Sequence, residues 1–136
     1  MPLPSVGGGY QVGDGNVNEP FLSDLGDPAT PTSTTTLTTA QIATQLMVAN
    51  PGTSAAAYTL PLGTDMDSAF GNAKVNSTIA FTIVNIGTSS GAITMTTNTG
   101  WGTLASTGSV TIAIGTSAQF LARRTGTATW VLYRVA

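Results

Sequence analysis

The chain has 136 residues, of which only 7% are charged, and it contains neither histidine nor cysteine. These absences exclude disulfides, zinc sites built on Cys or His ligands, and catalytic triads or dyads that need either residue. Four basic side chains are too few for a nucleic-acid-binding stripe, and the longest apolar stretches are too short to cross a membrane.

Residues 1–36 form the first predicted unit, an extended N-terminal arm. They contain five of the seven prolines, a run of three glycines and a Thr/Ser-rich stretch. Such a segment buries too little apolar surface to offset its own ordering entropy. Its apolar side chains are widely spaced, so we expect it to order on a neighbouring surface; a flexible tail is the alternative. The predicted contact residues of the arm are Tyr10, Val12, Phe21 and Leu22.

Residues 37–136 form the second predicted unit, a β-rich head domain that opens with a short helix. Thr38 and Gln41 have the spacing of a capping box, in which each side chain bonds the other's backbone N–H. This pattern predicts a helix over residues 39–48, and the Pro and Gly at positions 51 and 52 end it.

A strand and a second helical turn are predicted next. Residues 57–60 favour a strand that ends at Pro61. The segment that follows, residues 64–67, favours a short helix with Asp65 and Asp67 in its first turn, where the helix dipole stabilises acidic side chains. Capping of this helix explains the two aspartates better than a catalytic carboxylate pair, because the two do not face each other across a cleft.

The second half of the chain changes to an alternation of apolar and polar residues with a period of two. Ile79, Phe81 and Ile83 face one way in the first such run, and Trp130 and Leu132 do so in the last. Runs of this kind, separated by Gly, Ser, Thr and Asn turns, are typical of antiparallel sandwiches and barrels. We therefore predict a mainly β fold, with an antiparallel β-sandwich or barrel head, one or two short helices and the extended arm.

Charge is divided along the sequence, because all six acidic residues precede all four basic ones. The acidic part of one copy can complement the basic part of another, and complementary potentials set register and partner choice. Arg123, Arg124 and Arg134 are the candidate basic contacts, with Arg123 and Arg124 on opposite faces of one strand. Two interpretations stay open: pairing with the acids of a neighbour's arm, or a solvated edge that blocks aggregation.

Trp101 lies between two glycines in a predicted turn. It could stack on a sugar together with Tyr133, but a ring in this position more often closes the end of a sandwich core or packs on a neighbouring subunit. No catalytic, cofactor-binding or metal-binding residues are predicted, and we expect the protein not to be an enzyme.

Most of the head resembles a family of small phage virion proteins. The segments that carry the resemblance are LTTAQI at 37–42, AYTLPLGT at 57–64, FTIVNIG at 81–87, the Gly-Trp turn at 100–101, RRTG at 123–126 and VLYR at 131–134. The family is that of the capsid decoration (cement) proteins, especially those of cyanophages and marine phages. The resemblance implies a homotrimer on the outer face of an icosahedral capsid, an arm that laces onto neighbouring coat subunits, and no catalytic residues.

We therefore expect a structural virion protein, located on the outer surface of the capsid, that stabilises adjacent capsomers. Its expected partners are the major capsid protein and further copies of itself, with no nucleic acid, membrane or cofactor. Because a similar module occurs in phage fibres and spikes, a trimeric head or knob of such a structure is one alternative. A carbohydrate-binding β-sandwich using Trp101 and Tyr133 is the other.

Overall fold

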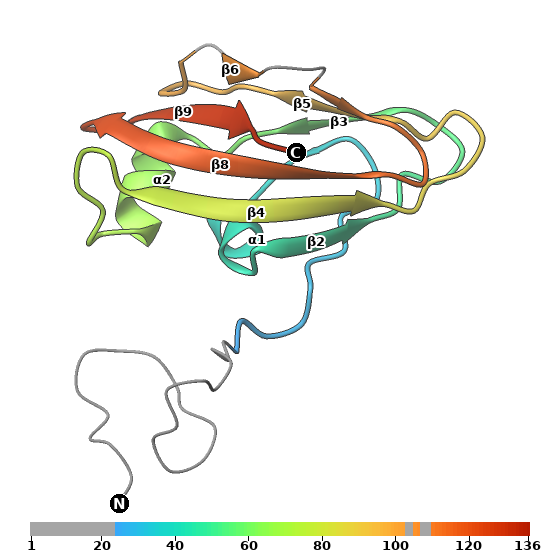
Figure 1. Ribbon diagram of the computed structural model, residues 1–136, viewed down its shortest axis with the longest axis horizontal. Helices are drawn as coiled ribbons and strands as arrows, with labels where there is room; N and C mark the ends of the chain where they lie inside the picture. Colours follow the sequence, from blue (N-terminus) through green and yellow to red (C-terminus); the bar gives the residue numbers. More distant parts are fainter. Residues whose placement is uncertain (1–23, 103–104, 107–109) are drawn as a thin grey trace, which may run out of the picture.

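The computed structural model describes residues 24–102, 105–106 and 110–136, whose strands form two sheets (Figure 1). The four-stranded sheet has the order β1-β3-β5-β7, with β1 at Thr35–Thr36, β3 at Ala56–Thr59, β5 at Ile93–Thr96 and β7 at Thr111–Ile112. The five-stranded sheet has the order β2-β4-β8-β9-β6, with β2 at Leu46–Ala49, β4 at Thr78–Asn85, β8 at Ser117–Gly126, β9 at Thr129–Arg134 and β6 at Ala105–Ser106. The helices are α1 at Thr39–Ala43 and α2 at Gly63–Ala69.

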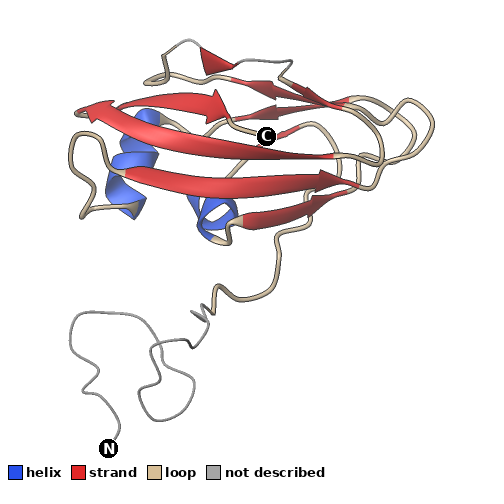
Figure 2. Ribbon diagram, viewed as in Figure 1, coloured by secondary structure: helices blue, strands red, loops and turns tan. Residues whose placement is uncertain are grey.

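The prediction of a mainly β, sandwich-like fold is confirmed, and neither sheet closes into a barrel (Figure 2). Alternate residues of both sheets are buried against each other, as the period-two pattern predicts. Phe81 and Phe120 stack in this core with ring centroids 5.5 Å apart, and Tyr58 and Ile93 contribute from the other sheet.

Strand pairing is mixed, which corrects the prediction of an antiparallel head. The pairs β4–β8, β8–β9 and β5–β7 are antiparallel, whereas β1–β3, β3–β5, β2–β4 and β6–β9 are parallel. From β1 to β5 the chain alternates between the two sheets, so each strand returns to its own sheet by a crossover and runs in the same direction. The period of two reports which face is buried and carries no information on strand direction.

The first helix is shorter than predicted. Its capping box is confirmed: the Gln41 N–H donates to Thr38 Oγ1 at 3.2 Å and the Thr38 N–H donates to Gln41 Oε1 at 2.8 Å. The helix ends at Ala43, however, because Gln45 adopts a left-handed φ of 58° that no helix continues through. Residues 46–48, predicted as the end of the helix, belong instead to the strand β2.

The described part of the predicted arm joins the sandwich before residue 37. Ala29 forms a parallel bridge with Met47 at the edge of β2, and the buried Tyr58 hydroxyl donates to the Pro31 carbonyl at 3.2 Å. Residues 24–28 are exposed and lead away from the sheets (Figure 1). Four of the predicted contact residues lie outside the described residues: Tyr10, Val12, Phe21 and Leu22.

Candidate subunit-contact surface

The outward face of the five-stranded sheet carries mostly aliphatic and hydroxyl side chains, and we call it the outer sheet face. On adjacent strands Val48 lies opposite Val84, and Leu121 lies between Ala80 and Tyr133. All five are half-buried. In the view of Figure 1, β4 and β8 lie in front and neither helix crosses them. The two apolar groups are separated on this face by the paired Thr82 and Gln119.

Arg123 is the one charged side chain on the described strands of the outer sheet face. Its Nε and Nη2 atoms donate to the Tyr133 hydroxyl at 3.0 and 2.7 Å, and Nη1 donates to Asn76 Oδ1 at 2.8 Å. The guanidinium carbon lies 5.6 Å from the centre of the Tyr133 ring. These contacts hold the cation against the sheet, next to the apolar residues.

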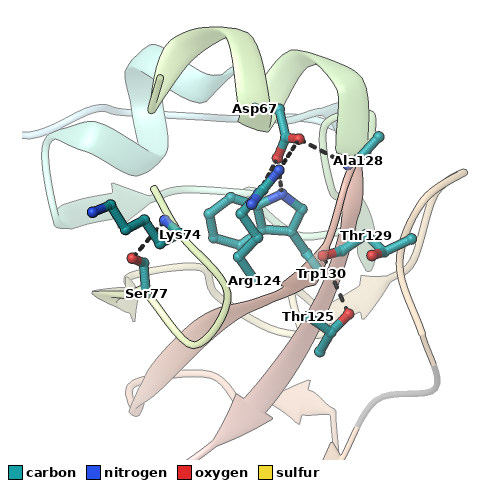
Figure 3. Close-up of polar contacts among 8 residues, drawn as sticks. All are labelled: Asp67, Lys74, Ser77, Arg124, Thr125, Ala128, Thr129 and Trp130. Carbon is teal, nitrogen blue, oxygen red and sulfur yellow. Dashed lines mark hydrogen bonds and ion pairs between the residues drawn. The ribbon is translucent and has the colours of Figure 1, made fainter. Parts of the chain in front are cut away.

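Arg124, the next residue, points to the other side of β8 and pairs within its own chain (Figure 3). Its Nε and Nη2 atoms donate to the two carboxylate oxygens of Asp67 at 2.9 and 2.8 Å. Asp67 also accepts the Ala128 N–H at 2.8 Å and the Trp130 indole N–H at 2.9 Å. The Arg124 guanidinium above all, followed by the Ala128 N–H, holds the pKa of the Asp67 carboxyl well below its usual range.

This network corrects the predicted role of Asp67 as a cap of α2. The N-cap of α2 is Leu62, no side chain bonds the start of the helix, and only Asp65 lies in its first turn. Asp67 instead joins α2 to the hairpin of β8 and β9. The bidentate pair also engages the charge of Arg124 within the head, whereas the hydrogen bonds of Arg123 within the described residues go only to the neutral side chains of Tyr133 and Asn76.

The other two predicted contact residues of the head are held at the ends of the fold. Arg134 Nη1 donates to the Thr111 carbonyl at 2.9 Å, and its Nε donates to the Ala136 carbonyl at 3.2 Å. Trp101 is half-buried, donates its indole N–H to the Pro61 carbonyl at 2.6 Å, and lies 6.3 Å from the Trp130 ring. It therefore packs on the end of the core. Tyr133 lies on the outer sheet face, so the structure does not bring these two rings into one sugar-binding platform.

An open groove of about 780 Å³ lies between the helices. Its lining is mostly hydroxyl and aliphatic groups, with Asp65 as the one ionisable side chain. Within the described residues, no group of three or more acidic side chains is placed to hold a metal ion. None of the described helices is long and apolar enough to span a membrane.

No protein-family model, curated protein or solved structure matches this chain.

Proposed function

We propose that this protein is a structural virion protein that binds the outer surface of a capsid, as a homotrimer, and stabilises adjacent capsomers. The observation that carries the proposal is the outer sheet face, on whose described strands half-buried aliphatic side chains and Tyr133 lie among uncharged polar ones, with Arg123 as the single charge. The cores of protein–protein interfaces have this composition: few charges, with aromatic residues and arginine enriched. The resemblance of the head to phage decoration proteins supports the same role.

The distribution of charge supports contact between arms and heads. Residues 1–36 hold four acidic and no basic side chains, a charge of −4, and residues 37–136 hold two acidic and four basic ones, a charge of +2, which together give the net −2. Opposite charge on the two units steers an arm towards a head and fixes its register. Contacts repeated over many copies add avidity without requiring a strong single site.

Quantitative mass spectrometry of purified virions tests this function. We expect the number of copies of this chain to equal that of the major capsid protein or a simple fraction of it. A few tens of copies or fewer would instead place the protein in a tail fibre or spike. Absence from virions would overturn both structural roles and favour testing the chain on a glycan array.

A further inference from the structure

A small apolar pocket opens at the end of the sandwich where β4 begins. It has a volume of about 300 Å³. Phe70, Ala73, Ile79 and the buried Trp130 form its apolar lining, and Ser77 and Thr78 contribute hydroxyl groups. The Phe70 and Trp130 rings are tilted at 57° with their centroids 6.4 Å apart. The pocket therefore reaches the aromatic end of the core.

The size and lining of this pocket define what it can bind. Its volume lies at the bottom of the range of small-molecule sites, roughly 300–1,000 Å³, which suits one large side chain rather than an extended ligand. Four of its seven lining residues are apolar and the other three, Gln45, Ser77 and Thr78, are uncharged, so a mostly apolar side chain fits it best. An aromatic side chain would complete the cluster of Phe70 and Trp130, because tilted ring pairs are favourable beyond their buried area.

The N-terminal segment of this chain contains a side chain of that kind between two acids. Phe21 and Leu22 lie between Glu19 and Asp24. On the head, the exposed Lys74 directly follows Ala73 of the pocket. Charges of opposite sign thus flank the apolar anchor and the pocket, which is the complementarity that orients a docked segment.

The path of the chain favours a neighbouring copy as the owner of this segment. Residues 24–28 are exposed and lead away from their own sheets (Figure 1). Phe21 is only three residues before Asp24, a reach of about 10 Å if extended. We propose that Phe21 of one copy binds in the pocket between Phe70, Ile79 and Trp130 of a second copy. This contact specifies what one apolar side chain of the arm binds, and its role in the virion rests on the proposed function.

Peptide binding tests the pocket directly. A fluorescent peptide of residues 15–27 is titrated into full-length protein carrying Phe21→Ala, which has no competing anchor of its own. We expect saturable binding, and a dissociation constant at least about tenfold higher for the Phe21→Ala peptide, because a buried aromatic anchor is worth more than one decade in affinity. A Val17→Ala peptide is the matched control and should bind like the parent.

A pocket-filling variant locates the binding site on the head. Ala73→Leu in the protein should weaken the parent peptide by a similar factor, whereas Ala55→Leu, at an exposed position outside the pocket, should not. Equal binding of the parent and Phe21→Ala peptides would overturn the proposal. This peptide comparison does not depend on whether Ala73→Leu folds.

Sedimentation velocity of the full chain identifies the source of Phe21. We expect concentration-dependent association of the wild type that Phe21→Ala weakens and Val17→Ala does not. A monomeric wild type whose unfolding temperature falls on Phe21→Ala substitution would place the segment in its own head and overturn the second-copy assignment. These measurements use purified protein, so they fail or succeed independently of the virion copy number that tests the proposed function.

Discussion

At the scale of single residues, the carboxylate of Asp67 joins several distant segments of the described chain. Arg124 and Trp130 are 57 and 63 positions away in sequence. No local sequence pattern indicates such a contact. The position of Asp67 near the start of a predicted helix instead suggests that its acidic side chain caps that helix. The sequence therefore predicted the helix and the presence of Arg124 on a strand, but not their connection.

The Asp67 network predicts a pH-dependent contribution to stability. The folded protein holds the pKa of Asp67 below its ordinary value of 3.8, so the charged form stabilises the fold above that pH and the contribution is lost as pH falls through the lower, folded-state pKa. Asp67→Asn should reduce the free energy of unfolding at pH 7 by about 1–3 kcal/mol, the cost of leaving part-buried hydrogen bonds poorly made. The difference from the wild type should shrink at pH 2–3.

Urea denaturation at both pH values measures this effect. Asp65→Asn, in the exposed first turn of the same helix, is the control and should change stability much less. A loss for Asp67→Asn that is equal at neutral and acidic pH would show that the charge of Asp67 is not what stabilises the fold.

At the scale of elements, a strand could be predicted only where the alternation of apolar and polar residues continued over enough positions. The long strands β4, β8 and β9 alternate over enough residues to reveal their buried faces. In β2 the pattern is only four residues long, and Ile42 and Leu46 stand four apart, as on one face of a helix. The left-handed Gln45 separates the two elements, and nothing local requires a glutamine to adopt that conformation.

The start of α2 is packed so closely on the β8–β9 hairpin that only glycine fits at position 63. A Cβ atom there would lie 2.1 Å from the Ala128 carbonyl oxygen and 3.0 Å from the Cα atom of Gly100. Because both neighbours are backbone, Gly63→Ala should destabilise the protein by at least about 2 kcal/mol, an overpacking cost. Thermal unfolding checks this, with Gly71→Ala as the control, since a Cβ atom there would have no neighbour within 4 Å.

A comparable midpoint for the two alanine variants would contradict this account of the helix and hairpin contact. Gly71→Ala should be neutral or slightly stabilising, by roughly 0.4–1 kcal/mol, because alanine restricts the unfolded chain.

At the scale of the whole molecule, the boundary between arm and head is set by contacts rather than by composition. At concentrations too low for one copy to bind another, removing residues 1–23 should leave the unfolding midpoint unchanged, because the described core begins later. Removing residues 1–36 deletes β1, the bridge of Ala29 to Met47 and both acceptors of the Tyr58 hydroxyl. The unpaired hydroxyl alone should cost about 1–3 kcal/mol.

Thermal denaturation of the two truncated proteins measures the difference. If both unfolded at the wild-type temperature, residues 24–36 would contribute nothing to the head despite their contacts. The shorter truncation is also the correct variant for testing the arm in capsid binding, because the longer one removes part of the head together with the arm.

The outer sheet face should control association of the whole molecule without controlling its fold. Leu121 is half-buried in the single chain, between Ala80 and Tyr133 on the neighbouring strands. Leu121→Asp leaves the new carboxylate in contact with water in the monomer, so the fold should be retained with a loss of about 1 kcal/mol.

In an assembly the same carboxylate would be buried against a second subunit, where an uncompensated charge costs several kcal/mol. Sedimentation equilibrium should therefore show markedly weaker association for Leu121→Asp than for the wild type or for Ala57→Asp, a half-buried position on the outward side of the other sheet. Unchanged association of Leu121→Asp would move the subunit contact away from this face.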